Sequence, residues 1–307
     1  MLGPFPRRRY VRNPLNLITE QGLRMEVDRL NEPEFESWDS YWTFARRVMQ
    51  SRRYVWDDYV RRFLDTVLAT NSNRDITIPR GIDLWRAQLG IDYDTRHDVE
   101  VPVGFSESRM RPVRHEAREG RANSAGIPVL YLASELNTAI SEVRPWVGSK
   151  ISVAGFRITR DLKAINLSMK FGENPLNDLS FGQLSGDKET DAEEKSNVVW
   201  ADIDNAFSRP VSLDERSAEY VPTQVLSELF WNAGYDAIAY RSQFGERGYN
   251  IAVRDIDDAE IVHCAPYDVS SIEVTSRKIG NAWFRRKPDR KDAREDDSEI
   301  DVKTVQD

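Results

Sequence analysis

Apolar side chains in the first quarter of the chain recur at the spacing of α-helices. They follow one another in steps of three and four residues: Phe35, Trp38, Trp42, Ala45 and Val48, then Val55, Tyr59, Phe63 and Val67. This period predicts one or two amphipathic helices, with Pro33 in the first turn of the first helix. We expect a helical region over residues 31–75, preceded by an arm over residues 1–30 that is rich in Pro and Arg.

After Pro79 the pattern changes to short apolar runs, which are typical of strands. Strands are expected over residues 83–88, 127–134, 150–159, 161–168, 235–242 and 251–254. One helix is expected from Glu135 to about Arg144, with Ser134 as its N-cap, and another over residues 220–234, ending at Gly234. Strands with helices between them predict an α+β core.

Four other stretches lack a regular apolar period. Residues 70–79 are polar and predict a linker, and residues 90–126 carry many charges with interspersed Pro and Gly, which favours loops. Residues 171–200 contain seven acidic residues and two Lys, which predicts an insertion loop or a lid. We expect residues 271–307 to form a charged, disordered tail, because the last twenty residues contain eight acids and four bases.

The composition fits a folded protein of 307 residues and excludes several kinds of site. Hydrophobic residues make up 40%, and the net charge of −8 argues against a protein that coats nucleic acid. Cys264 is the single cysteine and there are three His, so a disulfide framework and a cysteine-rich zinc site are excluded and no metal is expected. No apolar run approaches the roughly 20 residues of a membrane span, and no secretion signal is apparent. A cytoplasmic location follows as the expectation.

Common catalytic motifs do not occur in the sequence. It contains no Walker loop, no GxGxxG, no GxSxG elbow and no HExxH. His263 and Cys264 are adjacent, but neighbouring residues of a strand face opposite sides, so they would make a poor catalytic dyad. A buried structural thiol is the expected role of Cys264.

Five arginines fall within thirteen residues: Arg109, Arg111, Arg114, Arg118 and Arg121. Glu116 and Glu119 dilute the cluster. A solvated loop, a phosphate-binding loop and a nucleic-acid patch are all compatible with it. The planar guanidinium suits bidentate contacts with phosphate better than a lysine does.

Tyr131 and Glu142 are expected to lie close together, because Tyr131 belongs to a predicted strand and Glu142 to the helix that follows. Taken alone, Tyr131 fits a core aromatic residue with a hydrogen-bonded hydroxyl, and Glu142 fits a solvated acid on a helix. Both also fit a binding site, and the spacing does not decide between these interpretations.

Two strings of residues around this pair resemble the RES domain, a family named for its Arg, Glu and Ser. The first is Arg121-x-Asn123, then Gly-Ile-Pro-Val-Leu-Tyr-Leu-Ala over residues 126–133, then Thr-Ala-x-x-Glu-Val over residues 138–143. The second is Tyr-Asp-Ala-Ile-Ala-Tyr-Arg-Ser over residues 235–242, followed by Asn250, and Leu-Trp-Arg over residues 84–86 adds a looser match. The resemblance covers roughly residues 80–265.

The resemblance implies a domain over residues 76–270 that has a split central sheet similar to that of ADP-ribosyltransferases. It implies an enzyme that consumes NAD⁺ as a substrate by cleaving the nicotinamide–ribose bond, often as a bacterial toxin or defence effector. The catalytic residues implied are Glu142, Tyr131, Arg121 and Ser242, and the residues implied to bind substrate also include Arg86 and Asn250. No separate cofactor and no metal are required.

The acceptor of the ADP-ribose group remains open between water, phosphate and a protein. A mono-ADP-ribosyltransferase is therefore an alternative function, and a non-catalytic module that binds a nucleotide or nucleic acid is a second. The resemblance also implies an antitoxin or regulatory protein as a partner. The aromatic N-terminal helices could support a homo-oligomer or pack on the domain itself.

Overall fold

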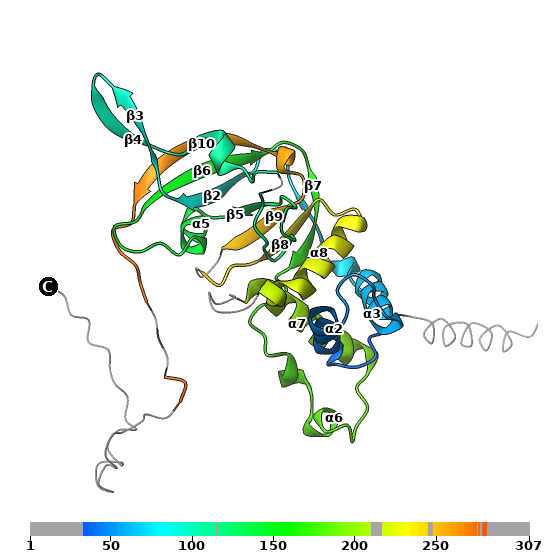
Figure 1. The fold of residues 1–307 in the computed structure, drawn as a ribbon. Coiled ribbons are helices and arrows are strands. Elements are labelled where there is room, and N and C mark those ends of the chain that lie inside the picture. The colour runs from blue at the N-terminus through cyan, green and yellow to red at the C-terminus, as the bar shows by residue number, and fades with distance from the viewer. Residues whose placement is uncertain are drawn as a thin grey trace, which may run out of the picture. The chain divides into compact units, whose positions relative to one another are not determined.

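The computed structural model describes residues 33–114, 116–209, 217–244, 248–274, 276 and 278–280. Residues 33–270 belong to one compact unit of helices and strands (Figure 1). The expected arm over residues 1–30 and most of the expected tail over residues 271–307 lie outside the described residues. The domain boundaries at residues 31, 76 and 271 therefore stay predictions.

Within the described residues, eight strands form one mixed sheet in the order β1-β7-β8-β9-β5-β2-β6-β10. The strands are β1 Asp75–Ile78, β2 Asp83–Leu89, β5 Leu130–Ala133, β6 Lys150–Ile158, β7 Leu162–Leu167, β8 Ala237–Arg241, β9 Tyr249–Val253 and β10 Ala259–Asp268. Neighbours are antiparallel except β7 and β8. β2 and β5 pair only through Trp85 and Ala133, so the sheet divides there into two halves. The expected α+β class with a split sheet is confirmed.

Helices cover this sheet, and a small hairpin projects from it (Figure 1). The hairpin consists of β3 Asp92–Arg96 and β4 Val99–Val103. The α-helices are α2 Ser40–Gln50, α3 Asp58–Ala69, α4 Glu107–Met110, α5 Leu136–Glu142, α6 Phe181–Leu184, α7 Ala192–Ser208 and α8 Val221–Asn232. Short 3-10 turns are η1 Ser72–Arg74, η2 Pro175–Asp178, η3 Ser217–Tyr220 and η4 Ile256–Asp258.

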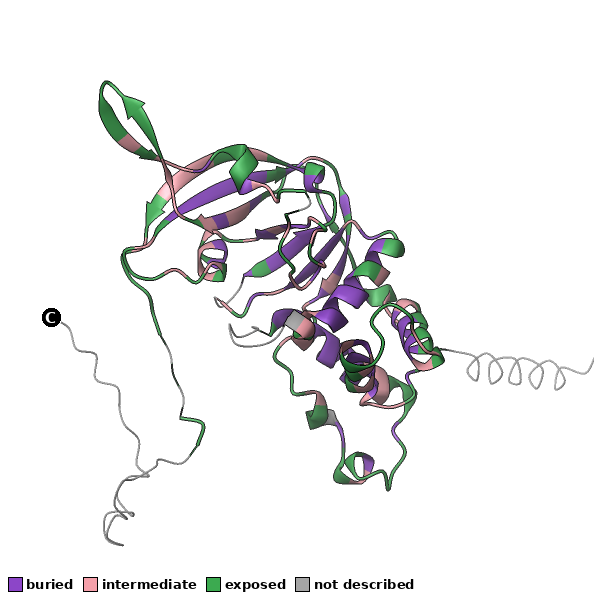
Figure 2. Ribbon diagram, in the orientation of Figure 1, coloured by how far each residue is buried: buried purple, intermediate pink, exposed green. Residues whose placement is uncertain are grey.

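The N-terminal helices α2 and α3 share a hydrophobic core with the sheet and with α7 and α8. Phe44 of α2 and Phe63 of α3 stack with their ring centroids 4.5 Å apart, and the same cluster contains Ile238 of β8. Figure 2 shows the buried inner faces of these helices. The predicted helices are confirmed, but the first begins at Ser40 and not near Pro33, because a turn comes first, in which the Ser37 amide donates to the Ser40 hydroxyl.

The acidic stretch over residues 171–200 is not the loop that we expected, because its last nine residues begin the long helix α7. Asp191 caps this helix and forms a capping box with Glu194, so the acids gather at the positive end of the helix dipole. Val199 and Trp200, one turn further on, are buried. The helix was missed because capping acids resemble a polar loop in composition.

Four further strands, β1, β3, β4 and β10, arise where loops or no element were expected. β1 and β10 are the two outer strands of the sheet, and the hairpin is mostly exposed. Strands at the edge of a sheet or in an exposed hairpin can pair without burying apolar side chains on one face. Their sequences therefore show no clear alternation of apolar and polar residues. The polar linker predicted over residues 70–79 contains β1 for this reason.

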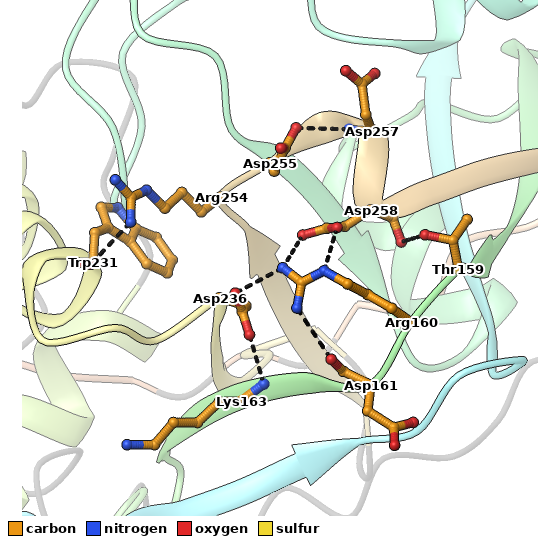
Figure 3. A network of polar contacts seen from close by, with 10 residues as sticks. All are labelled: Thr159, Arg160, Asp161, Lys163, Trp231, Asp236, Arg254, Asp255, Asp257 and Asp258. Carbon is orange, nitrogen blue, oxygen red and sulfur yellow. Dashed lines mark hydrogen bonds and ion pairs between the residues drawn. The ribbon is translucent and has the colours of Figure 1, made fainter.

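An ion-pair network, here called the Arg160 corner, joins strand ends that are far apart in sequence (Figure 3). Arg160 donates to both carboxylate oxygens of Asp258 and to Asp236, each at 2.7 Å. Asp236 also accepts from the Lys163 amide at 2.9 Å, and Thr159 donates to the Asp258 carbonyl at 3.0 Å. The corner thereby ties β6, β7, β8 and β10 together at one end of the sheet.

Candidate active site

A cavity of about 290 Å³, here called the first cavity, opens at the place where the sheet divides. Its walls come from β2, from the loop before β5, from β5 itself, and from α5, β8 and β9. It brings together five of the six predicted site residues: Arg86, Arg121, Tyr131, Glu142 and Asn250. The sixth, Ser242, does not line it.

Glu142 is the last residue of α5, the helix that follows β5. This helix is shorter than predicted, and Ser134 is not its side-chain cap, because the Ser134 hydroxyl accepts from the Tyr249 amide of the neighbouring strand β9 at 3.0 Å. The strand–helix connection still turns the exposed end of α5 toward the cavity. The predicted proximity of Tyr131 and Glu142 is confirmed, since both line its wall.

Two hydrogen bonds hold the carboxylate of Glu142 in place. Ser242 donates to its Oε1 atom at 2.7 Å, and Asn250 donates to the same oxygen at 2.6 Å. Because both bonds end on Oε1, they hold the carboxylate without engaging Oε2.

Ser242 acts in this structure as a support for Glu142. Its side chain is buried, with 2% of its surface exposed, and its hydroxyl also accepts from the Phe244 amide at 3.0 Å. We expected this hydroxyl to contact the ribose or the amide of a substrate. The structure shows the hydroxyl bonded to the carboxylate of Glu142, and its contact with substrate stays a prediction.

Tyr131 is held rigidly at the cavity wall. Its hydroxyl accepts from the Ala122 amide at 2.9 Å and donates to Asn123 Oδ1 at 2.7 Å. Burial raises the pKa of Tyr131 well above its usual value, so the phenol stays neutral. A Cβ atom at Gly120 would lie 2.6 Å from this hydroxyl, which explains why a glycine precedes Arg121. Tyr131 is therefore both an aromatic residue with a hydrogen-bonded hydroxyl and part of the wall of the first cavity.

Arg86 brings a positive charge to the cavity without a carboxylate beside it. Its Nη1 atom donates to the Tyr131 carbonyl at 3.0 Å, and its Nε atom is buried and has no hydrogen-bond partner among the described residues. Burial lowers the pKa of Arg86 to about 10, so it remains a cation at neutral pH. A buried cation with an unused donor favours binding of an anion in this cavity.

Arg121 also lines this cavity, and it contacts the end of α7. Its Nη1 atom donates to the Ala206 carbonyl at 3.0 Å, and its Nη2 atom donates to the Arg209 carbonyl. These bonds place a cation at the negative end of the helix dipole. They use two of the five N–H donors of the guanidinium, so donors remain for a ligand.

Three other members of the arginine cluster are used by the fold. Arg109 pairs with Asp92, Arg111 donates to the carbonyls of Ile256 and Ala259, and Arg114 pairs with Asp257. For these three, the contacts favour a structural role over the interpretation as a phosphate-binding loop. Arg121 is the member of the cluster that reaches the cavity.

Sequence reasoning missed two aromatic residues of the cavity, Trp85 and Tyr240. Tyr240 is buried, with 4% of its surface exposed. Burial is the largest influence on the pKa of Tyr240 and raises it above the usual range, although opposing charge acts in the other direction. Its position in the middle of an apolar strand looks like that of any core residue. Both residues belong to strings that resemble the family, Trp85 to Leu-Trp-Arg over residues 84–86 and Tyr240 to the string over residues 235–242, and these strings were the available signal for them.

The structure also tests other kinds of site. His263 lies against Gly155 and Cys264 against Gly104, so the two side chains face opposite sides as expected. Within the described ranges, no three His, Cys, Asp or Glu residues come together as a metal-binding group. None of the described helices has the length and apolar content that crossing a bilayer requires.

Comparisons with known proteins identify the family. The family model described as the RES domain matches residues 84–276, more than half of the chain. A similar solved chain belongs to the M. tuberculosis MbcT–MbcA toxin–antitoxin complex, with 12% identity over 63% of this chain and 88% of that chain. Its TM-score is 0.32, a likeness too weak to carry an argument about fold or function. No curated protein matches the sequence.

Proposed function

Because the chain belongs to the RES domain family, we propose that it consumes NAD⁺ by cleaving the bond between nicotinamide and ribose. One observation carries the proposal: the fixed carboxylate of Glu142 shares a 290 Å³ cavity with two arginines and a rigid tyrosine. A carboxylate and two arginines in one cavity suit a substrate that carries a positive charge at one end and a diphosphate in the middle.

The chemistry of the bond gives Glu142 its role. When the bond breaks, neutral nicotinamide leaves with the electron pair, and the ribose C1′ becomes an oxocarbenium-like cation, as in glycoside cleavage. A carboxylate that is held in position before the bond breaks stabilises this charge as it develops. In hydrolysis, a water oxygen then bonds to C1′ and a proton is released to solvent. Glu142 Oε1 is already occupied by Ser242 and Asn250, so we assign the contact with ribose to Oε2.

The remaining residues bind and orient the substrate. Arg86 and Arg121 supply charge-assisted hydrogen bonds to phosphate oxygens. Tyr131 and Tyr240 offer aromatic surface to the nicotinamide ring. Ser242 and Asn250 keep the carboxylate in place, which reduces the reorganisation needed during reaction. No step requires a metal or a separate cofactor.

The predicted lid has no part in this mechanism, because the residues lining the first cavity include none from residues 171–200. The setting follows from the family alone. An enzyme that depletes NAD⁺ harms its own cell, so we propose a toxin or defence effector that is restrained by an antitoxin or another regulatory protein. Water, phosphate and a protein side chain are all chemically able to attack C1′.

The direct test is release of nicotinamide from NAD⁺ by the purified full-length chain, with and without phosphate. We expect release in at least one condition, and at least about 100-fold slower release by Glu142→Gln, which keeps the size of the side chain and removes its charge. Glu135→Gln is the matched control, because Glu135 precedes the same helix and its side chain forms no cap bond. Equal rates for wild type and Glu142→Gln would overturn the proposed role of Glu142.

Product analysis separates the alternatives. Free ADP-ribose indicates hydrolysis, its 1″-phosphate indicates phosphorolysis, and labelled adenylate attached to a protein indicates ADP-ribosyl transfer. A folded chain that releases no nicotinamide in any condition would reject the enzyme. Tight, salt-resistant nucleic-acid binding by such a chain would then favour the non-catalytic module, because a chain with a net charge of −8 should otherwise bind weakly and lose its binding as salt rises.

A further inference from the structure

A second cavity, of about 470 Å³, lies on the other side of Arg121. Its walls come from α2, α7, η3 and α8, and they include Tyr41, Trp42, Asp202, Tyr220 and Thr223. We propose that this second cavity binds the adenosine half of the dinucleotide, so that the N-terminal helix α2 is part of the substrate site. This inference rests on the proposed function and deepens it.

Size is the first argument. Ligand sites commonly have volumes of about 300–1,000 Å³. At about 290 Å³ the first cavity is at the lower end of that range, which suits one nucleoside better than a whole dinucleotide. A second cavity that begins at the same arginine supplies the space for the other nucleoside.

The arrangement of charge matches the order of groups in the ligand. In a dinucleotide the diphosphate lies between two nucleosides, and here Arg121 lines both cavities. Arg209 adds a second guanidinium to the wall of the second cavity. A diphosphate beside Arg121 would direct one nucleoside toward Glu142 and the other toward α2.

The lining of the second cavity fits a nucleoside. Tyr41, Trp42 and Tyr220 offer aromatic surface against which a purine can stack. Asp202 is a buried carboxylate at 7% exposure, and Trp42 is hydrogen-bonded to it. A carboxylate beside a nucleoside site accepts hydrogen bonds from ribose hydroxyls, as it does in many dinucleotide-binding folds.

The contribution of α2 comes from outside the matched domain. The family match begins at residue 84, whereas α2 covers Ser40–Gln50. The helix is firmly placed, since Phe44 and Val48 lie in the core that it shares with α7 and α8. Tyr41 and Trp42 are thereby presented to the second cavity by a rigid element.

Trp42→Ala tests the inference, because Trp42 lines the cavity and is 43% exposed, so its loss leaves the core intact. The substrates are NAD⁺ and nicotinamide mononucleotide, which has the same scissile bond but lacks the adenosine half. We expect kcat/KM for NAD⁺ to fall about 10-fold, within the range for loss of one base-stacking aromatic residue. Turnover of the mononucleotide should not change. Trp38→Ala is the control, because Trp38 precedes the same helix and does not line the cavity.

Direct binding keeps the test valid if the chain releases no nicotinamide. Calorimetric titration with ADP-ribose, which has no scissile nicotinamide, should give about 10-fold weaker binding by Trp42→Ala than by wild type and by Trp38→Ala. Equal ADP-ribose binding by all three proteins, or equal losses for both substrates, would overturn the adenosine subsite. Absence of nicotinamide release together with the expected binding difference would reject the proposed reaction but retain the subsite.

Discussion

The Arg160 corner and the first cavity hold arginines from neighbouring strands in opposite surroundings. Arg160, just beyond β6, bonds to two carboxylates at 2.7 Å, and these bonds raise its pKa (Figure 3). Arg86, on the adjacent strand β2, forms no ion pair within the described residues, and burial lowers its pKa to about 10. Both side chains are cations at neutral pH, but the charge of Arg160 is neutralised by the fold.

The difference predicts which charges stabilise the fold and which serve the proposed substrate site. A paired guanidinium stabilises the contacts between strand ends, and nothing in its surroundings calls for a ligand. An unpaired and partly buried guanidinium raises the free energy of the folded protein, which is a cost that binding of an anion offsets. Charges without partners should therefore collect at the cavities, and removing them should affect function more than stability.

Arg86→Met gives the largest expected effect. If Arg86 binds phosphate as proposed, its loss should lower kcat/KM for NAD⁺ by about 100-fold, the size of a charge-assisted hydrogen bond. The midpoint of thermal unfolding should stay the same or rise, because an unpaired charge leaves the interior. Steady-state kinetics and thermal melts on the same preparations measure both effects.

Arg86→Lys and Arg96→Met serve as controls for that experiment. The lysine keeps the charge and should restore part of the activity. Arg96 pairs with Asp94 on the exposed hairpin, so its replacement should change neither quantity. A marked loss of stability in Arg86→Met would contradict the comparison, since it would make Arg86 a structural residue like Arg160.

Asp202 extends the comparison to an acid, and Asp202→Asn should give the next largest effect. Burial raises its pKa to about 7, and no ion pair to it occurs in the described part of the chain. Between pH 4 and 7, Asp202 is therefore protonated in the folded protein but ionised in the unfolded chain. The contribution of this group to the free energy of unfolding declines as the pH rises through that range. The side chain of Asn does not titrate, so Asp202→Asn removes this decline. The free energy of unfolding of Asp202→Asn minus that of wild type should therefore be about 2 kcal/mol larger at pH 8 than at pH 5.

Urea unfolding at the two pH values measures this difference. Asp65→Asn, at an exposed position of α3, should follow the wild type at both pH values. A constant offset between Asp202→Asn and wild type would show that Asp202 does not retain its proton in the folded protein, and that its charge is balanced as it is in Asp258.

The parts of the fold and site that sequence could predict are those set by neighbouring residues. The helices around Phe44 and Phe63 followed from apolar spacing, and the nearness of Tyr131 and Glu142 followed from a strand and its next helix. The hydrogen bonds from Ser242 and Asn250 to Glu142 join positions 100 and 108 residues apart, which no local pattern encodes. The resemblance to the family supplied those residues, although it did not supply their geometry.

The second cavity lay beyond sequence reasoning for a related reason. Trp42 belongs to the apolar stripe of a predicted helix, where its expected role was packing on the domain or contact with another copy of the chain. Asp202 lies in a helix whose beginning had been taken for an acidic loop, so its burial was not expected. The proposed roles of Trp42 and Asp202 become apparent only when the tertiary structure brings each residue beside a partner from another element.

Arg160→Met gives the smallest expected effect and completes the comparison. It removes the bonds to Asp236 and Asp258 and should lower the free energy of unfolding by about 1 kcal/mol, because the Arg160 side chain is half exposed and solvent screens its charge. Turnover of NAD⁺ should not change. Arg157→Met is the matched control, since Arg157 pairs with Asp83 where both side chains are exposed, and its loss should cost less. Denaturant unfolding with activity assays measures both variants, and reduced turnover in Arg160→Met at full stability would show that paired charges also serve the site.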